Sequence, residues 1–444
     1  MCAVVGVFGV KDASKVAYYS LFSMQHRGQE SSGISSSHER KHYLIKNRGH
    51  VTDIFNEEML TNTLKGDMAV GHNRYSTAGD DSILDAQPVF ARYDLGDISI
   101  VHNGNLTNKE EVRNALIQNG AIFQTHMDTE NLIHLIAKSN EEKLEERIID
   151  AVNKIKGAFS LIIMSRSKMY VIRDRYGFRP LSLAKLEDGY VSASETCAYD
   201  LVGAQYLRDV KPGEMVVFAH GKEPRSKQLW EPEEFKCVFE HIYFARPDSM
   251  VFGSNVYQNR ERMGIELAKE LPVEADLVVP VPDSGVAAAL GYSKESGIPF
   301  ELGIIRNHYV GRTFIEPSQA MRNLKVKMKL NPIINVIKNK KVVVIDDSIV
   351  RGTTSKRIIQ MLKDAGAREV HMRISAPPTT GPCFYGVDTP DKDELISSRM
   401  STEEIREYIG ADSLAYLSID GLMRSIEEKD GYCKACFDGK YLEE

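Results

Sequence analysis

The stretch KVVVIDDSIVRGTT, residues 341–354, decides the fold of the second half of this chain. Its apolar run, 342–345, predicts a strand buried on both faces of a parallel sheet. Asp346 and Asp347 follow at the carboxyl end of that strand, the edge at which open α/β sheets bind ligands. Apolar residues then recur at helical spacing: Ile358, Ile359 and Leu362. The order strand, carboxylate pair, loop and amphipathic helix therefore predicts a ligand site on an α/β sheet.

The loop after the carboxylates predicts an anion site, because a helix N-terminus offers free backbone N–H groups and the loop adds hydroxyls. A polar turn with a helix cap would explain a lone Asp-Asp pair, but the whole pattern is more restrictive. It closely resembles the diphosphate-ribose loop of type I phosphoribosyltransferases. The resemblance implies binding of 5-phosphoribosyl 1-diphosphate (PRPP) with Mg²⁺, one ion per subunit. It assigns the ribose hydroxyls and the metal shell to Asp346 and Asp347, and the 5-phosphate to the following loop: Ser348, Val350, Arg351, Gly352, Thr353 and Thr354.

The bulk composition favours an ordinary globular protein of two domains. The chain has 444 residues, more than a single hydrophobic core normally serves. Its 42% apolar and 27% charged residues predict a sizeable core without disorder. The net charge of −6, with no dominant basic block, argues against a nucleic-acid partner. No run is long enough to span a bilayer, and the apolar start lacks a charged leading segment, so we expect a cytoplasmic protein without membrane association.

Two patterns of secondary structure divide the chain. The first half is predicted to be rich in strands, at 3–8, 67–70, 98–101, 161–164, 169–172 and 215–219, with helices at 109–119 and 128–137, where Asp128 is a candidate cap. The polar, proline-containing region 221–235 is the expected linker. After it, a helix at 256–271 and strands at 277–281, 302–305 and 342–345 alternate, which predicts a parallel α/β sheet. The basic segment 316–335 is either a lid over the site or a solvated loop.

Cys2 is the second chemical clue. If Met1 is removed, Cys2 gains a free α-amino group with a pKa of roughly 7.7–8.0. That amine can act as the base for its own thiol, so the nucleophile needs no histidine partner. A cysteine at position 2 also occurs by accident, and alone it would support no function.

Four motifs give Cys2 its context: QHRGQE at 25–30, GHNRYST at 71–77, HNGN at 102–105 and HMDTE at 126–130. Together they resemble the glutaminase domain of the N-terminal-nucleophile hydrolases, whose fold is an αββα sandwich. The resemblance implies that Cys2 attacks the glutamine carboxamide. It implies an oxyanion hole from Asn103 and Gly104, and glutamine binding by Gly28, Arg74, Thr77 and Asp128. The chain departs from the family at Ala3, where glycine is usual.

The chemistry of glutamine suits these assignments. The planar fork of Arg74 matches an α-carboxylate, and the carboxylate of Asp128 matches an α-ammonium group. Preorganised donors from Asn103 and Gly104 suit a developing oxyanion. The histidines of the motifs are scattered singly and lack the spacing of a zinc site, so we interpret them as hydrogen-bonding residues.

Four of the six cysteines form a candidate metal site. Cys433 and Cys436 are a close pair, and Cys237 and Cys383 bring the number of thiols to four. Four thiolates suit zinc or an iron–sulfur cluster, and spacing does not decide between them. In a reducing compartment, a disulfide is the less favoured use. Cys197 has no partner in this scheme and is expected to be a small buried residue.

The chain as a whole resembles the glutamine PRPP amidotransferase family, in its iron–sulfur-containing branch. The resemblance implies a [4Fe–4S] cluster on the four cysteines, with zinc as the less favoured alternative, and a Mg²⁺ site at Ser284, Asp346 and Asp347. The implied fold is α+β and then α/β: an αββα glutaminase domain at 2–230 and a phosphoribosyltransferase domain with a cysteine-bearing tail at 231–444. The implied reaction moves ammonia from glutamine to PRPP, the first committed step of purine biosynthesis. Feedback by purine nucleotides and a homotetramer are also implied.

Three other functions fit parts of the sequence. A glucosamine 6-phosphate-forming amidotransferase would share the glutaminase half and lack the Asp346–Asp347 loop. A nucleobase salvage phosphoribosyltransferase would not need Cys2 or Arg74. A PRPP-sensing regulator would lose the nucleophile and carry a DNA-binding module, for which the sequence gives no sign. Since free ammonia is lost to protonation in water, the coupled reaction also predicts a dry path between two sites, closed by segment 316–335.

Overall fold

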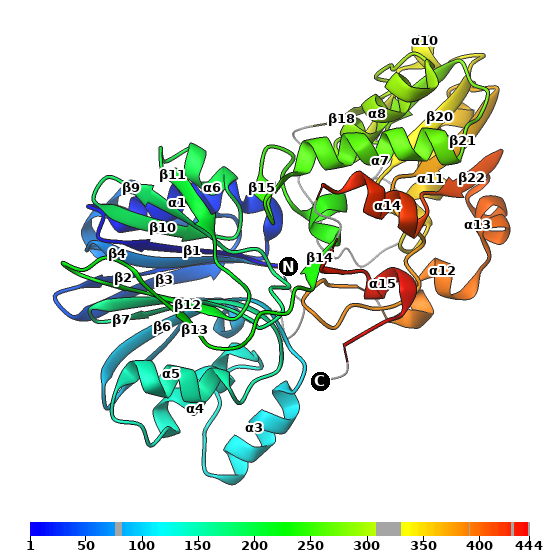
Figure 1. The fold of residues 1–444 in the computed structure, drawn as a ribbon. Helices are drawn as coiled ribbons and strands as arrows, with labels where there is room; N and C mark the ends of the chain where they lie inside the picture. The colour runs from blue at the N-terminus through cyan, green and yellow to red at the C-terminus, as the bar shows by residue number, and fades with distance from the viewer. Residues whose placement is uncertain (76–81, 308–329, 390, 428–429, 443–444) are drawn as a thin grey trace.

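The computed structural model describes all residues of the chain except 76–81, 308–329, 390, 428–429 and 443–444. The chain forms two lobes, and the N-terminus lies at their junction beside β14 (Figure 1). The first lobe is built on two large antiparallel sheets and the second on a smaller parallel sheet. The junction therefore brings the start of the chain next to the second lobe.

The first sheet of the first lobe has seven antiparallel strands in the order β11-β9-β10-β1-β4-β2-β3. Their bounds are β1 Ala3–Phe8, β2 Ser31–His38, β3 Lys41–Arg48, β4 Met68–Arg74, β9 Ser182–Leu186, β10 Gly189–Ala193 and β11 Gln205–Asp209. The second sheet has six antiparallel strands in the order β13-β12-β8-β7-β6-β5. Their bounds are β5 Val89–Tyr93, β6 Gly96–Leu106, β7 Gly157–Ser165, β8 Lys168–Arg173, β12 Glu214–Ala219 and β13 Arg225–Gln228.

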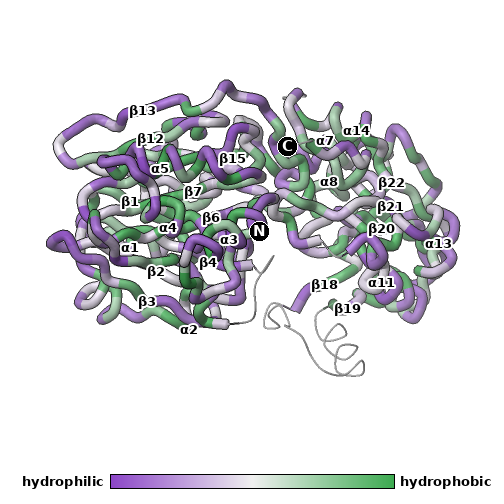
Figure 2. Tube along the Cα trace, turned by 90° about the horizontal axis from the view of Figure 1, so that it is seen from below, coloured by the Kyte–Doolittle hydropathy of each residue, from purple (hydrophilic) through white to green (hydrophobic). Residues whose placement is uncertain are grey.

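Helices cover the outer faces of both sheets, which makes four layers. The first sheet carries α1 (Ala13–Ser23), α2 (Val51–Ile54) and α6 (Cys197–Asp200), and the second carries α3 (Lys109–Gln118), α4 (Thr129–Lys138) and α5 (Leu144–Val152). Along β1, Val5 and Val7 pack toward α1, whereas Val4 and Phe8 pack toward the other sheet. This alternation is the period of a strand buried on both faces. Figure 2 shows the hydrophobic residues gathered along these inner strands.

The second lobe contains the parallel sheet predicted from residues 341–354. Its order is β17-β20-β21-β22, with β17 Leu277–Pro280, β20 Lys341–Asp346, β21 Glu369–Ile374 and β22 Ser413–Tyr416. Val343 and Ile345 pack toward α7 (Val256–Glu270) and α8 (Val286–Ser296). Val342 and Val344 pack toward α11 (Thr353–Asp364) and α13 (Thr402–Ile409). Helices on both faces explain why residues 342–345 of β20 form an unbroken apolar run.

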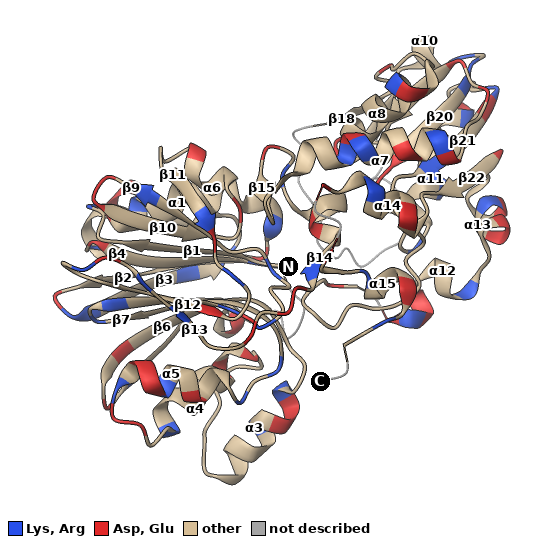
Figure 3. Ribbon diagram, in the orientation of Figure 1, with Lys and Arg blue, Asp and Glu red and all other residues tan. Residues whose placement is uncertain are grey.

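Smaller elements complete the two lobes. Three short sheets pair β14 (Lys236–Cys237) with β23 (Tyr432–Cys433), β15 (Met250–Val251) with β16 (Ser254–Asn255), and β18 (Ile304–Arg306) with β19 (Leu330–Pro332). The remaining short helices are η1 Gln25–Arg27, η2 Met59–Thr63, η3 Ile83–Asp85, η4 Glu240–Phe244, α10 Ile334–Ile337, η5 Lys392–Glu394, α12 Ile396–Arg399, α14 Ile419–Ser425 and α15 Ala435–Asp438. Acidic and basic side chains are mixed on outer helices such as α7 and α13 (Figure 3), in keeping with the small net charge. None of the helices in the described residues is long and apolar enough to cross a membrane.

Two sequence expectations need correction. Region 221–235 was expected to be a linker, but β13 pairs with β12 and extends the second sheet of the first lobe. The strand expected at 302–305 does not join the parallel sheet: β18 pairs with β19, antiparallel, after a single bridge from Phe300 to Val278. In both cases a polar or short segment pairs with the edge of a sheet, and the sequence of the segment itself does not reveal that pairing. The candidate lid, 316–335, lies mostly outside the described residues.

Candidate functional site

Cys2 lies immediately before β1, at the junction of the lobes. The register of β1 against β4 places it beside the carboxyl end of β4. Its backbone N–H donates to Oδ1 of Asn103 at 3.0 Å, and its thiol lies 3.6 Å from the carbonyl oxygen of Tyr75. Met1 precedes it and is buried, and this burial lowers the pKa of the Met1 amino group to about 6. The first peptide of the chain is thus held in place by neighbouring strands.

The two residues predicted to form an oxyanion hole lie next to Cys2. Asn103 is buried in β6 and uses its Oδ1 to hold the Cys2 backbone, while its Nδ2 donor is buried without a hydrogen-bond partner. Gly104 follows it, and a Cβ there would lie 1.9 Å from the carbonyl oxygen of Ala158, so only glycine fits. A buried donor without an acceptor beside a thiol is the arrangement that a developing oxyanion completes.

Two of the predicted glutamine-binding residues meet at the end of β4. The Arg74 guanidinium is buried, with Nη2 3.9 Å from Oδ2 of Asp85. Gly28 packs directly on this strand end: a Cβ there would lie 2.5 Å from the Arg74 carbonyl carbon. Thr77 lies outside the described residues. The buried, planar cation of Arg74 suits a carboxylate partner.

Asp128 occupies the N-cap position of α4, as the sequence predicts, but its side chain makes no capping hydrogen bond there. Its carboxylate instead accepts a hydrogen bond from the Leu106 N–H at 3.1 Å and lies 3.4 Å from Nδ1 of His102. Burial acts to raise its pKa, but His102 and the Leu106 hydrogen bond outweigh it, so the pKa of Asp128 lies below its usual range. The side chain is therefore an ionised carboxylate, as binding of an ammonium group requires.

The motif histidines make hydrogen bonds, as the sequence predicts. His26 Nε2 lies 2.9 Å from a carboxylate oxygen of Glu195, and His72 Nε2 lies 3.1 Å from the carbonyl oxygen of His102. Burial lowers the pKa of His72 to about 3, so this ring is neutral in the core. These rings support the walls of the site.

A second constellation lies at the carboxyl end of β20. Asp346 ends the strand, and its Oδ1 accepts hydrogen bonds from the Ser284 hydroxyl at 3.3 Å and the Asp347 N–H at 2.9 Å. Oδ1 of Asp347 accepts from the Ser348 hydroxyl at 2.9 Å, while its Oδ2 is buried without a partner. The three residues predicted to surround Mg²⁺ are therefore brought together, with an oxygen left for a cation.

Burial raises the pKa of both carboxylates. The pKa of Asp347 rises to about 6, and the adjacent negative charge helps to raise that of Asp346 well above its ordinary value. A divalent cation would reverse this tendency, because it favours the ionised form of both groups.

The predicted 5-phosphate loop runs from this pair into α11. Gly352 precedes the helix with φ +74°, and a Cβ there would lie 2.7 Å from a side-chain carbon of Ile396. Thr353 and Thr354 are exposed at the first turn, where backbone N–H groups have no partner within the helix. Arg351 is exposed as well and forms an ion pair with a neighbouring glutamate. Val350 is half-buried on the same loop. The loop thus exposes hydroxyls and N–H groups to an anion.

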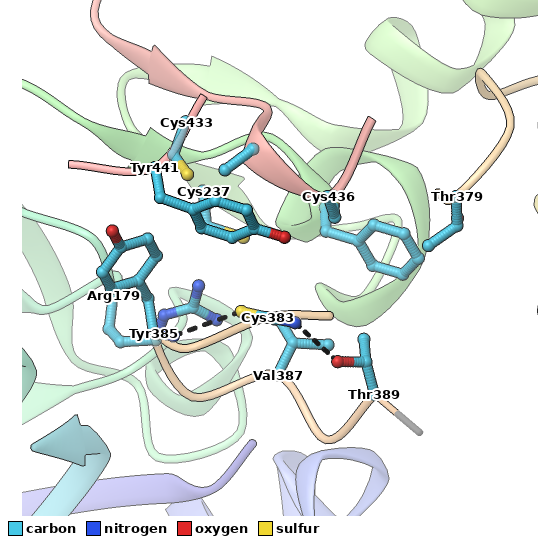
Figure 4. Close-up of a pocket in the computed structure, with 12 residues that line it drawn as sticks. Arg179, Cys237, Thr379, Cys383, Tyr385, Val387, Thr389, Cys433, Cys436 and Tyr441 are labelled. Atoms are coloured by element: carbon cyan, nitrogen blue, oxygen red, sulfur yellow. Dashed lines mark hydrogen bonds between the residues drawn. The ribbon is translucent and has the colours of Figure 1, made fainter. Parts of the chain in front are cut away.

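The four candidate metal-binding cysteines line one cavity between the lobes (Figure 4). The parallel pairing of β14 with β23 places Cys237 opposite Cys433. Cys436 lies in α15, and its carbonyl oxygen accepts from the N–H groups of residues 380–381 at 2.9 and 3.1 Å, which brings in the loop of Cys383. All four are free thiols, and among the described residues no three Cys, His, Asp or Glu are placed to hold one metal ion. The chain thus gathers four thiols from three distant segments.

The wall of this cavity carries donors without acceptors. Nε and Nη2 of Arg179 and the hydroxyl of Thr379 are buried and have no hydrogen-bond partner. The Tyr385 N–H donates to the sulfur of Cys383 at 3.3 Å. Burial raises the pKa of Cys433 to about 12, so this thiol stays protonated without a cation beside it. Orphan donors and a buried guanidinium fit an anionic group held by four thiolates.

Sequence reasoning missed the buried charges behind these sites. Arg27, Arg179, Glu195 and Glu240 have fully buried side chains. Arg27 bonds Glu195 at 2.5 Å and both oxygens of Glu240 at 2.9 Å. Arg27 lies inside the QHRGQE motif, so its position was available from the sequence. Arg179 and Glu240 carry no local signal, because only the folded chain shows that they are buried.

Comparisons with known proteins agree with both halves. Residues 72–200 match the glutamine amidotransferase domain family, and residues 253–383 match the phosphoribosyl transferase domain family. A glutaminase lobe joined to a phosphoribosyltransferase lobe defines a glutamine-dependent phosphoribosyltransferase. The chain belongs to the amidophosphoribosyltransferase family, as its relatives establish. It is an enzyme of the first step of purine biosynthesis, which transfers ammonia from glutamine to PRPP.

The relatives match over nearly the whole chain. Amidophosphoribosyltransferase of Bacillus subtilis is 47% identical, with 99% of this chain and 94% of the relative covered. The chloroplastic enzyme of Vigna aconitifolia is 50% identical, with 99% and 91% covered. A solved structure of the B. subtilis enzyme complexed with ADP and GMP has a TM-score of 0.94 at 47% identity and covers 99% of this chain and 97% of that chain. A second structure, of an allosteric regulatory enzyme of purine biosynthesis, has the same TM-score and identity and covers 99% and 96%.

Proposed function

We propose that Cys2, freed by removal of Met1, is the nucleophile that releases ammonia from glutamine. The amine of Cys2 takes the thiol proton, and the sulfur attacks the glutamine carboxamide. Nδ2 of Asn103 and the N–H of Gly104 stabilise the resulting oxyanion. Collapse of the tetrahedral intermediate breaks the C–N bond, releases ammonia and leaves a thioester, which water hydrolyses to glutamate. The observation that carries this proposal is the double use of Asn103, with one amide atom on the Cys2 backbone and the other free.

Glutamine recognition is assigned to charged groups around this nucleophile. Arg74 pairs with the α-carboxylate, and Asp128 holds the α-ammonium group. Gly28 keeps the strand end accessible, and Thr77 completes this set as the motif implies. The low pKa of Asp128 supports its role, because the carboxylate remains ionised at neutral pH.

The second half-reaction is assigned to the end of β20. Asp346 and Asp347 bind the ribose hydroxyls of PRPP, and Ser284 orients Asp346 through its hydroxyl. The 5-phosphate lies on the loop of Ser348, Val350, Arg351, Gly352, Thr353 and Thr354. A bound Mg²⁺ neutralises the leaving diphosphate. Ammonia then forms a bond to C1 of the ribose as the bond to diphosphate breaks, giving 5-phosphoribosylamine.

The four cysteines are assigned to a [4Fe–4S] cluster with a structural role, and zinc is the alternative. Cys237, Cys383, Cys433 and Cys436 would be the ligands. The orphan donors of Arg179 and Thr379 support an anionic group there. Tyrosine and phenylalanine side chains line the wall, and an apolar shell of this kind suits a cluster.

The organisation of the enzyme is proposed in the same way. The glutaminase domain spans 2–230 and the phosphoribosyltransferase domain 231–444. We assign a homotetramer in the cytoplasm, where cysteines stay reduced. Purine nucleotides are the expected feedback inhibitors, a proposal that the nucleotide complex of the B. subtilis relative supports.

The deciding experiment is Cys2→Ala, assayed for diphosphate release from PRPP with glutamine and with ammonium chloride. Glutamine-dependent activity should fall below detection, and ammonia-dependent activity should change by less than about twofold, since the second site is intact. Cys197→Ala is the matched control and should keep both activities. Loss of both activities in Cys2→Ala would contradict the assignment of separate sites.

A further inference from the structure

A buried chain of charged side chains joins the cysteine cavity to the peptide of Cys2. Arg179 lines the cavity, and its Nη1 lies 3.5 Å from Oε1 of Glu240. Glu240 holds Arg27 through two hydrogen bonds of 2.9 Å. Nε of Arg27 in turn donates to the carbonyl oxygen of Cys2 at 2.9 Å. The side chains of Arg27, Arg179 and Glu240 have no exposed surface, so solvent ions screen these contacts little.

The same chain is anchored to a cavity cysteine through the backbone. β14 ends at Cys237, and η4 begins at Glu240. The Cys237 N–H donates to the carbonyl oxygen of Phe178 at 3.2 Å, next to Arg179 in sequence. A group bound to the Cys237 sulfur therefore restrains the short segment that carries Glu240.

A second cysteine restrains the oxyanion side of the nucleophile. In the loop of Cys383, the Phe384 carbonyl oxygen accepts from Nδ2 of Asn105 at 2.8 Å. Gly386, in the same loop, lies against Gly104: a Cβ there would lie 2.9 Å from the Gly104 backbone. Two of the four cavity cysteines thus lie on segments that contact the two sides of the glutaminase site.

We propose that Glu240 and Arg179 are positioning residues through which the group held by the four cysteines fixes the backbone of Cys2. With the group in place, the guanidinium of Arg179 faces two anions, the cysteine-bound group and the carboxylate of Glu240. Glu240 then keeps Arg27 on the Cys2 carbonyl. Without the group, Arg179 loses its anionic partner in the cavity and competes with Arg27 for the carboxylate of Glu240. This inference rests on the proposed use of Cys2 and of the four cysteines.

The test removes the metal group and the Glu240 carboxylate separately and together, as in a double-mutant cycle. Wild-type enzyme and Glu240→Gln are each prepared with the metal group, under anaerobic conditions, and after its removal by a chelator. The measurements are glutaminase kcat and KM, the rate of Cys2 alkylation by iodoacetamide followed on the N-terminal peptide by mass spectrometry, and ammonia-dependent synthesis. If the metal group and Glu240 act through the same chain of contacts, either change alone should lower glutaminase kcat by about tenfold or more. The two changes together should lower kcat by less than about twofold beyond either change alone. Losses that multiply would overturn the proposal.

Two further proteins separate this role from general damage. Glu234→Gln removes a partly exposed carboxylate paired with Lys236, near the same segment, and should behave as wild type. Arg179→Gln should keep its metal content yet show the slowed glutaminase and altered Cys2 alkylation of Glu240→Gln. If removal of the group unfolds the chain, the metal-containing variants alone decide, and unchanged Cys2 alkylation in both of them refutes the proposal. Absence of any metal in wild-type enzyme would instead refute the assignment of the cysteine site.

Discussion

Two adjacent buried carboxylates, Asp346 and Asp347, set the pH behaviour of the phosphoribosyl site. Burial raises the pKa of Asp347 to about 6, and that of Asp346 is raised as well. Because both pKa values exceed the unfolded value of 3.8, the folded chain binds more protons than the unfolded chain between about pH 4 and 6. The contribution of this pair to stability is therefore present at low pH and is lost as pH rises through the folded pKa values.

This arrangement predicts proton release when Mg²⁺ and PRPP bind. A cation requires the ionised carboxylates, so binding at pH 6 should release protons, and affinity should fall by about tenfold per pH unit below pH 6 for each proton released. Calorimetric titration in two buffers of different ionisation enthalpy measures the number released. At pH 6, where Asp347 is about half protonated, Asp347→Asn should release about half a proton fewer than wild type. Proton release independent of Asp347 would contradict the assignment.

The residues to which we assign direct chemistry could be proposed from the sequence, whereas the buried charges behind them could not. Cys2, Asn103 and the Asp346–Asp347 pair lie in short motifs whose chemistry depends on local order. Arg179 and Glu240 gain their role only from burial beside segments far away in the sequence. The side chain of Asp128, at the N-cap position of α4, is used elsewhere for the same reason, since its partner Leu106 belongs to β6.

Among the elements, the loop that carries Cys383 makes close contact with the first lobe. Gly386 has φ +101°, and its Cα faces the backbone of Gly104 with no room for a Cβ. Tyr385 stacks on Phe178 at 4.2 Å between ring centroids, which fixes the loop against the first lobe. A side chain at position 386 must therefore displace either this loop or the oxyanion residue.

Gly386→Ala is expected to lower glutaminase kcat by about ten- to a hundredfold through displacement of Gly104, while ammonia-dependent synthesis is retained. The control is Gly120→Ala. Gly120 also has a positive φ, of +79°, but a Cβ there meets no atom within 4 Å. Both variants therefore carry the same kind of backbone strain, and only Gly386→Ala carries the contact. Equal activity in the two variants would show that the contact does not reach the oxyanion hole.

Strands that are buried on both faces were predicted well from their apolar sequences, and strands at sheet edges were not. β1 and the 342–345 run of β20 alternate between two packed layers, so these stretches are apolar and predict their place. β13 is polar and exposed along its length, and it is a strand because β12 offers a free edge. β18 is likewise defined by its partner β19. Pairing at an edge depends on the neighbour, which a single sequence does not show.

For the whole molecule, the four-cysteine cavity is the point at which both lobes and the C-terminal tail meet. Cys237 enters from the segment that follows the first lobe, Cys383 from the loop after β21, and Cys433 and Cys436 from the tail. A group bound to all four closes long loops, and its binding energy is available only to the folded chain. It should therefore stabilise the junction more than either lobe.

Removal of the metal group is accordingly expected to separate the unfolding of the two lobes. Differential scanning calorimetry of the metal-containing enzyme should show one main unfolding transition. The metal-free enzyme should show an additional, earlier transition, whose midpoint temperature is lower by at least about 5 °C. Cys383→Ser should lose the group and reproduce the earlier transition. Cys197→Ser, which alters a buried thiol outside the cavity, should keep both the metal and the main transition.

The first lobe has two large sheets and three cores of its own, so it should remain folded after the junction opens, and the earlier transition should belong to the second lobe and the tail. An unchanged thermogram after complete removal of the metal would show that packing alone, including the Phe178–Tyr385 stack, holds the lobes together.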